Sequence, residues 1–156
     1  LLIDGIGKSR HGIQVVGGAN VRLSHCTITR TGIGVELEGA AAVTLRNCIV
    51  WGNKVGLAGA KSRSIVDHCC IQGPLPGMAL DRGGNLMTSP RFVPGPSGDF
   101  YLADAPRPSP CIDAGRNPAA YSGIDELTTR RDLRRDRGRA DLGFHYPAPA
   151  LRRGTP

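Results

Sequence analysis

Aromatic residues are scarce in this 156-residue chain, which has one Trp, three Tyr and three Phe, or 4% of the sequence. Long hydrophobic runs are missing as well, because stretches such as residues 40–43 fall far short of the roughly 18 residues of a membrane span. Leu1–Asp4 resembles neither a signal peptide nor a chain start, so we expect a C-terminal portion of a longer protein. The composition excludes collagen, coiled coil and membrane span, and it predicts one modest domain with an aliphatic core.

Acidic residues are also in deficit, since 13 Asp and Glu stand against 20 Lys and Arg and give a formal charge of +7. Half of the basic residues lie from Arg107 onward, and six arginines between 130 and 139 are mixed with Asp132 and Asp136. Such a run of mixed sign is typical of a solvated loop, and no aromatic residue is interleaved to stack on bases. We therefore expect no nucleic-acid partner.

The sequence contains an internal repeat of 21 to 22 residues. Segments 12–15, 34–37 and 56–59 align at a constant step of 22, and each unit holds three short pieces with apolar residues at alternate positions. This period of two is typical of strands and not of helices. Stacked units would place equivalent side chains in inward columns: Ile13, Val35 and Leu57; Val15 and Leu37; Leu23, Leu45 and Val66; Ile28, Val50 and Ile71.

Three strands per unit predict an all-β fold, a right-handed parallel β-helix of about three coils over residues 1–73. A leucine-rich repeat is disfavoured because its Leu-x-x-Leu-x-Leu frame is missing. Two Pro and two Gly within residues 72–77 end the repetition and begin a Gly- and Pro-rich connection over 74–98. We expect an irregular C-terminal cap over 99–147 to close the end of the stack, followed by a flexible tail over 148–156.

The five cysteines are odd in number, and three occupy one repeat position. Cys26, Cys48 and Cys69 are predicted to stack inward as small hydrophobes, where Cβ vectors of equal direction disfavour disulfides. Cys70 should point outward, and Cys111 lies in the predicted cap. A bridge between Cys70 and Cys111 is compatible with an oxidising compartment, and the sequence leaves their disulfide state open.

Two histidines beside these cysteines raise the question of a metal site. His25 and His68 stand at the same repeat position, and His and Cys are favoured zinc ligands. The middle coil has Asn47 at that position, and inward cysteines point away from outward ligands. We therefore predict bend or surface residues and no metal site.

The C-terminal third carries recognisable motifs. They are Ser89–Val93, Gly98–Leu102, Thr128–Asp132, and above all Ser109–Gly115 and Asp141–Pro147. Together they resemble the C-terminal signature of bacterial right-handed parallel β-helix repeat proteins, including the choice-of-anchor Q type domain, which share the pectin lyase-like fold. Ser89 stands where that family usually has Asp, and Leu133 where Gly is usual. The resemblance implies a secreted or surface-anchored protein, and it implies no particular reaction.

Five residues of these motifs are predicted to be structural: Asp113, Gly115, Arg130, Asp141 and Gly143. A short acid at a turn accepts backbone N–H bonds or pairs with an arginine, and Arg130 lies near in sequence. Calcium is the alternative partner, since carboxylates and turn carbonyls are its ligands. No other cofactor is expected.

The best enzyme-like cluster in the coils combines Glu36 and Glu38, two residues apart in one strand, with Arg22 and Arg46 of the neighbouring strand segment. We interpret these four residues as a tentative glycan face. The acidic pair is not repeated in the adjacent coils, as a long catalytic cleft would require, so no catalytic residue is assigned.

Two functions remain open. The first is a monomeric, extracellular or cell-surface β-helix that binds a polysaccharide or cell-envelope glycan, or serves as a structural stalk. The second is a fragment of a polysaccharide lyase or glycoside hydrolase of the pectate lyase-like superfamily, with its catalytic coils upstream of Leu1. Such a lyase needs a calcium-binding acidic cluster and a basic residue, and such a hydrolase needs paired carboxylates.

Overall fold

The computed structural model describes residues 1–61 and 63–149, so most of the predicted tail, residues 150–156, lies outside the described residues. No helix in this part of the chain is long and apolar enough to cross a membrane. Its elements are β1 (Leu2–Asp4), β2 (His11–Val15), β3 (Asn20–Ser24), β4 (Thr27–Thr29), β5 (Ile33–Leu37), β6 (Ala42–Arg46), β7 (Ile49–Val50), β8 (Val55–Ala58), β9 (Ser64–Asp67), β10 (Cys70–Ile71), β11 (Ala79–Asp81), β12 (Phe92–Gly95), β13 (Gly98–Leu102), the 3₁₀ helix η1 (Ala119–Ser122), β14 (Leu127–Thr128) and β15 (Tyr146–Pro147).

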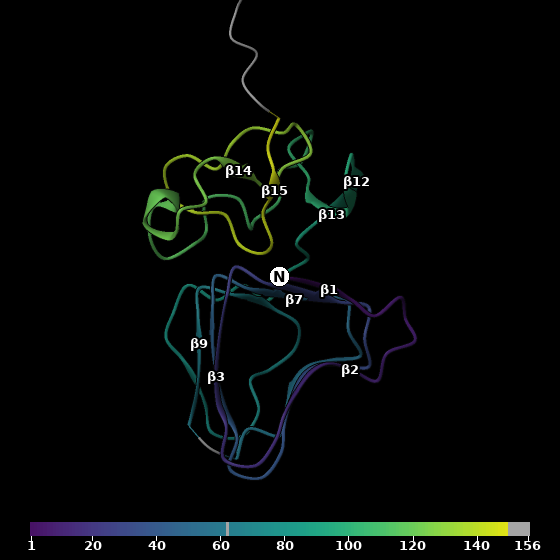
Figure 1. Ribbon diagram of the computed structural model, residues 1–156, viewed down its shortest axis with the longest axis vertical. Helices are drawn as coiled ribbons and strands as arrows, with labels where there is room; N and C mark the ends of the chain where they lie inside the picture. The colour runs from purple at the N-terminus through teal and green to yellow at the C-terminus, as the bar shows by residue number, and fades with distance from the viewer. Residues whose placement is uncertain (62, 150–156) are drawn as a thin grey trace, which may run out of the picture.

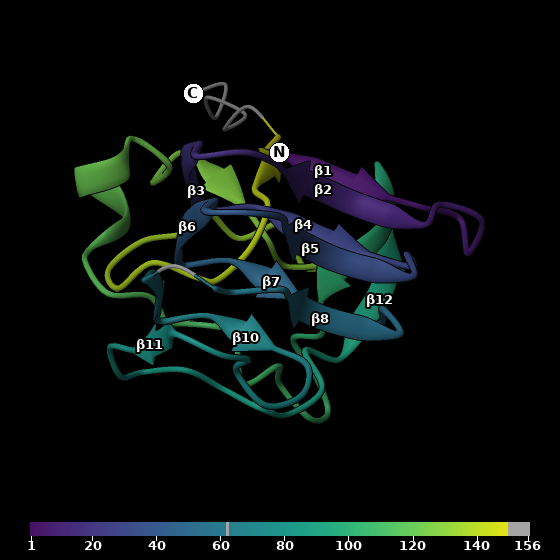
Figure 2. The ribbon, with the colours of Figure 1, turned by 90° about the horizontal axis from the view of Figure 1, so that it is seen from below.

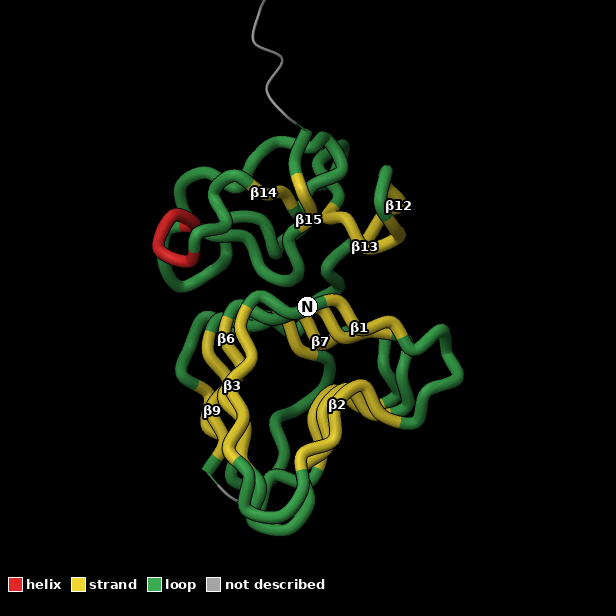
Figure 3. Tube along the Cα trace, in the orientation of Figure 1, coloured by secondary structure: helices red, strands yellow, loops and turns green. Residues whose placement is uncertain are grey.

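The first eleven strands form three parallel sheets wound as a coil. The first sheet has the order β1-β4-β7-β10, the second β2-β5-β8 and the third β11-β9-β6-β3. Each turn of the chain visits the three sheets in succession, which gives the triangular outline seen down the stack in Figure 1 and in Figure 3. Seen from the side, the turns lie one beneath another (Figure 2). The predicted all-β parallel β-helix of about three coils is confirmed.

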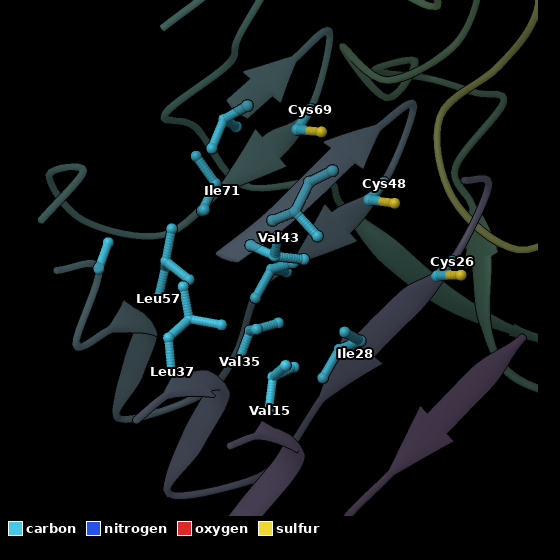
Figure 4. Close-up of a cluster of buried hydrophobic side chains, with 14 of the residues drawn as sticks. Val15, Cys26, Ile28, Val35, Leu37, Val43, Cys48, Leu57, Cys69 and Ile71 are labelled. Atoms are coloured by element: carbon cyan, nitrogen blue, oxygen red, sulfur yellow. The ribbon is translucent and has the colours of Figure 1, made fainter. Parts of the chain in front are cut away.

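The predicted inward columns are the hydrophobic core of the coil. Ile13 pairs with Val35, and Val35 with Leu57, in consecutive strands of the second sheet. The other predicted columns are in register too, and they meet in one buried cluster (Figure 4). Cys26, Cys48 and Cys69 belong to that cluster, so their inward stacking is confirmed. Slim side chains suit this narrow interior, which explains the shortage of aromatic residues in the coils.

The histidine position of the repeat is a bend of the coil. His25, Asn47 and His68 all have a positive φ, of 49°, 52° and 49°. Among residues other than Gly, Asn, Asp and His adopt this left-handed conformation most readily. The prediction of bend residues is confirmed, and the shared backbone conformation explains why His and Asn exchange at one position.

The parallel stack extends beyond the predicted boundary at residue 73. β11 pairs with β9, and Leu86 forms a further parallel bridge with Cys70. Leu75 and Ala79 pack against the coil core. The segment 74–98 is therefore more than a connection, because its first half adds most of another turn and covers the last coil. Pro74 and Pro76 precede the short strand β11 and leave that strand's ladder intact.

The C-terminal cap contains the antiparallel pairs β12-β13 and β14-β15 and the short η1, so it is mostly irregular, as predicted. It lies beside the first sheet and not over the end of the stack (Figure 1), which corrects the expected placement. The outward side chains of that sheet explain the difference: Ile49 and Cys70 are in register, and Leu102, Cys111 and Leu142 of the cap bury them in a second cluster.

Candidate functional site

A groove of about 590 Å³ lies at the corner between the first and second sheets. The chain turns there once per coil, after β1, β4 and β7 and before β2, β5 and β8. Because the coils repeat at 22 residues, the corner positions form columns across three coils. These columns are Lys8, Arg30 and Gly52; Ser9, Thr31 and Asn53; and Arg10, Gly32 and Lys54.

The groove is strongly basic. Lys8, Arg10 and Lys54 are exposed, and their side chains form no hydrogen bond or ion pair with another described residue. The fourth cation, Arg30, makes a two-pronged ion pair with Asp4 and lies 4.9 Å from the centre of the Phe100 ring. The Asp4 hydrogen bond raises the pKa of Arg30 further above its usual value. Three uncompensated positive charges therefore line one continuous corner.

The floor of the groove is rigid because it is built from buried hydrogen bonds. Asn53 is 4% exposed, and its Oδ1 accepts bonds from the Thr31 backbone N–H (3.0 Å) and the Thr31 hydroxyl (2.8 Å). The Asn53 amide nitrogen donates to the carbonyl of Ile28 at 3.1 Å. These bonds tie the corner at Thr31 to the corner at Asn53 in the next coil, so the backbone that carries Arg30 and Lys54 is held at the spacing of the coils.

A second depression continues the groove toward the last coil. It has a volume of about 340 Å³, shares Lys54 with the first, and is bounded by Gln72, Pro74 and Pro76. The Gln72 side chain accepts a hydrogen bond from the backbone N–H of Gly52 at 2.9 Å, so a residue that lines the second depression is bonded to one that lines the first. Together they form a track along the coil stack that suits an extended ligand better than a compact one.

The tentative glycan face does not exist as one surface. Glu36 lies in β5 of the second sheet, and Glu38 is the first residue after that strand. Arg22 in β3 and Arg46 in β6 belong to the third sheet. The two acids are bridged by Gln14, whose amide nitrogen lies 2.6 Å from Glu38 Oε1 and 3.4 Å from Glu36 Oε2. The prediction was wrong because consecutive strands of a coil belong to different sheets.

Arg46 serves the junction between coil and cap. Its guanidinium contacts Asp67 at 3.1 Å, and Arg116 of the cap and the His68 ring bind the same carboxylate. Burial alone would raise the pKa of Asp67, but the hydrogen bonds from His68, Arg116 and Arg46 hold it below its usual value. With a side chain only 1% exposed, Asp67 is a structural anion that no ligand reaches.

Asp141 is buried and accepts hydrogen bonds within the cap, and none of the described arginines forms an ion pair with it. Its carboxylate accepts bonds from the backbone N–H of Asp113 at 2.7 Å and from the Thr129 hydroxyl. Burial raises the pKa of Asp141 to about 6, the nearby Asp136 carboxylate raises it too, and these hydrogen bonds oppose the rise. The ring nitrogens of His145 lie 2.7 Å from Asp136 Oδ2 and 3.0 Å from the Gly143 carbonyl oxygen, so the ring joins these two parts of the cap.

The other motif residues have separate tasks. Asp113 is exposed with φ 54°, and its contact with Asp141 is made by its backbone N–H, which donates to that carboxylate at 2.7 Å. Arg130 pairs with Asp132 and not with Asp113 or Asp141, because its Nε and Nη2 both donate to the nearby Asp132 carboxylate. A Cβ at Gly115 would lie 2.6 Å from the Ala140 carbonyl oxygen, so Gly is required for close approach within the cap.

A cavity of about 370 Å³ lies between the coil and the cap, and His25, Ser122 and His145 are among the residues that line it. Burial lowers the pKa of His25 to about 4, and the His145 ring 5.4 Å away lowers it further. Its Nε2 lies 3.1 Å from the Asn47 amide nitrogen, a donor, so the ring is neutral. Among residues 1–61 and 63–149, no three His, Cys, Asp or Glu side chains are grouped to hold a metal ion.

Sequence reasoning missed the basic groove, although the repeat contains the signal for it. Lys8 and Arg30 stand 22 residues apart, as do Ser9 and Thr31, in the turns that the strand alignment left aside. Extending the alignment from the apolar positions to the corners would have revealed the columns. In this repeat, basic residues that recur at one corner of the coil indicate a ligand site better than two acids within one strand do.

The comparisons with known proteins agree with this geometry. The family model described as the right handed beta helix region matches residues 4–97, while no curated protein and no solved structure matches the chain significantly. The matched residues include the strands of the three parallel sheets from β2 onward and the residues that line the basic groove. The chain therefore belongs to the right-handed β-helix family.

Proposed function

We propose that this chain binds an extended acidic polysaccharide along the basic groove at the corner of its coils. The observation that carries the proposal is the row of three cations, Lys8, Arg10 and Lys54, which have no partner among the described residues. An unpaired cation on a folded surface is ready to accept an anion without first breaking an internal ion pair. Carboxylates of a uronic acid polymer supply such anions at regular intervals.

The shape of the site favours a polymer. Coils stack at roughly 4.8 Å, so each turn presents its corner side chains once per strand spacing along the axis. A chain of sugars that lies along the track meets equivalent positions of successive coils, and Lys54 joins the two depressions. The rigid floor of Thr31 and Asn53 lowers the entropy cost of binding, because the groove is ordered before the ligand arrives.

The proposal extends to the setting in which the chain works. A secreted or surface-anchored, monomeric protein of the choice-of-anchor Q type would meet cell-envelope glycans outside the cell. Support comes from the motifs Ser109–Gly115 and Asp141–Pro147, which carry the resemblance and whose residues hold the cap on the coil. A binding or scaffolding role is favoured over catalysis, since the residues that line the basic groove include no Asp or Glu to serve as a calcium ligand or as one of a pair of catalytic carboxylates.

The test is a titration calorimetry series with an oligogalacturonide, and with a neutral oligosaccharide of equal length as the reference ligand. The variant Lys8→Gln/Arg10→Gln/Lys54→Gln is expected to lose about ten-fold or more in affinity for the acidic ligand. Its matched control, Arg22→Gln/Lys61→Gln/Arg63→Gln, removes the same charge elsewhere on the coils and is expected to bind almost as the unmodified protein does. Equal losses in the two variants would reduce the effect to net charge, and absence of binding by the unmodified chain would refute the proposal.

The enzymatic alternative is tested with the same ligand. A lyase acting on acidic polysaccharide in the presence of calcium produces unsaturated ends, which are followed by their new ultraviolet absorbance. We expect no increase above the rate without protein. A steady increase that Lys8→Gln/Arg10→Gln/Lys54→Gln abolishes would make the groove an active site and overturn the binding-only proposal.

A further inference from the structure

Two cysteines from different parts of the chain meet at the junction of coil and cap. Cys70 projects from β10 on the outer face of the first sheet, and Cys111 belongs to the Ser109–Gly115 motif of the cap. Both are fully buried in the second cluster, beside Ile49 and Leu142. The two residues are members of one small buried cluster of five side chains, and both thiols are free.

Each cysteine is held in place by its surroundings. The Cys70 thiol donates to the Thr88 carbonyl at 3.1 Å, and its strand is paired with Leu86 on the open side. Cys111 is fixed through its backbone, whose N–H donates to the Ser109 hydroxyl oxygen at 3.1 Å and whose carbonyl accepts from Leu142 at 2.9 Å.

We propose that Cys70 and Cys111 form a disulfide that fastens the cap to the coil when the protein folds in an oxidising environment. Two thiols lose two protons and two electrons as the S–S bond forms. A small-molecule disulfide such as oxidised glutathione accepts both and is cleaved into two thiols. The bond crosses the junction of the two regions, so it would add a covalent link where the structure otherwise has only packing and hydrogen bonds.

The other three cysteines compete less well for a bond. Cys26, Cys48 and Cys69 lie at equivalent positions of stacked parallel strands, with Cβ vectors that point the same way (Figure 4). That arrangement rarely gives the dihedral angle that a disulfide requires. Cys70 comes from the coil and Cys111 from the cap, so the two are not related by the parallel stacking of strands. Adjacent Cys69 and Cys70 are separated by the sheet, because one lies in the coil core and the other in the junction cluster.

The burial of the pair also says when the bond can form. The contact with Cys111 and burial both raise the pKa of Cys70 far above its usual value, so the thiolate is scarce in the folded protein. Oxidation is therefore expected during folding, before the cap has closed on the first sheet. Once formed, the bond should resist a mild reductant in the native protein and yield to it in denaturant.

The test is oxidative refolding of the whole chain with reduced and oxidised glutathione, followed by alkylation of free thiols, trypsin digestion and mass spectrometry. The expected product links peptide 64–82 to peptide 92–116 and disappears on reduction. Because peptide 64–82 holds both Cys69 and Cys70, Cys69→Ser is the matched control that keeps the link, whereas Cys70→Ser and Cys111→Ser lose it. Compared with the reduced form, the linked protein should melt roughly 10 °C higher.

The mapping on the unmodified protein decides the outcome even where a variant fails to fold. A natively folded product with five alkylated cysteines would overturn the proposal. A link that runs through Cys26, Cys48 or Cys69 would overturn it as well. Because the cysteines lie apart from the basic groove, neither result bears on glycan binding.

Discussion

The coils and the cap are held together by contacts of two different kinds. In the coils the same apolar contact is made again in each turn, as in the column Leu23, Leu45 and Val66. In the cap each contact is made once, and many are polar, such as the bond from the Asp113 N–H to Asp141 or from His145 to Asp136. A repeated contact reveals itself in the sequence as a period, whereas a single contact leaves no pattern.

The junction between the two regions combines both kinds. The cap closes on the first sheet through an apolar cluster around Ile49, while the Gly143 N–H donates to the Asn47 carbonyl at 2.8 Å. The Phe144 N–H donates to Thr27 Oγ1 at 2.9 Å, and Arg116 reaches Asp67. Coil residues thus supply acceptors that only the cap satisfies, which indicates that the two regions fold as one unit.

The largest expected effect is in the repeated core. Leu45 is wholly buried in the column between Leu23 and Val66, so Leu45→Ala opens a cavity with neighbours above and below that cannot collapse into it. We expect a loss of about 3 to 4 kcal/mol in the free energy of unfolding, measured by urea denaturation. Leu23→Ala, at the half-buried end of the same column, should lose clearly less. Equal losses would show that the coils do not share a continuous core.

The next effect tests the junction. Gly143 has φ +90°, and a Cβ there would lie 2.7 Å from Thr27 Oγ1 and 2.8 Å from Ile49 Cδ1. Gly143→Ala should therefore cost about 2 to 3 kcal/mol through strain and displacement of the cap. Gly138→Ala is the matched control, because Gly138 has φ +87° with no atom near its added Cβ. If the two variants lose the same stability in urea, the tight fit of cap on coil is not important.

The third prediction concerns acid, where two buried groups oppose each other. The pKa of His25 is lowered to about 4, so its contribution to stability is complete above 6.5 and is lost as pH falls toward 4. The pKa of Asp141 is raised to about 6, so its contribution is complete below 3.8 and is lost as pH rises through 6. The two largely cancel between pH 4 and 6.

Substitutions separate the two groups. Asp141→Asn should make the protein lose about 2 kcal/mol more than the unmodified chain on going from pH 6.5 to 4, because the substitution removes the opposing contribution of Asp141. His25→Asn, which places the residue of position 47 in the same bend, should reverse the sign of that difference. Urea denaturation at several pH values measures both. Parallel curves for all three proteins would refute the opposed titration.

The smallest effect compares two exposed arginines. Arg116 binds Asp67, whose side chain is 1% exposed, whereas Arg131 lies 3.4 Å from the more exposed Asp104. Arg116→Met should cost about 1 kcal/mol, because Arg46 and His68 still compensate the buried carboxylate, and Arg131→Met should cost less than about 0.5 kcal/mol. The reverse order in thermal melts would mean that the junction does not depend on this ion pair.

The same difference explains what the sequence could predict. The parallel β-helix and its inward columns follow from the period, and even the bend at His25 was found at its repeat position. The cap's location on the flank was not predictable, since it depends on Ile49 and Cys70 facing outward and on where a nonrepeating segment meets them. The glycan face failed for a related reason: strand neighbours in sequence lie on different sheets.

Native-state hydrogen exchange tests most directly whether coil and cap are one folding unit. The amides to compare are those of Leu45 in the coil, Gly143 at the junction, and Leu142, which donates to the Cys111 carbonyl within the cap. We predict that all three open with the same free energy, within about 1 kcal/mol of the global free energy of unfolding. Fast exchange of Leu142 and Gly143 while Leu45 stays protected would contradict the account, because it would show that the cap detaches while the coils remain folded.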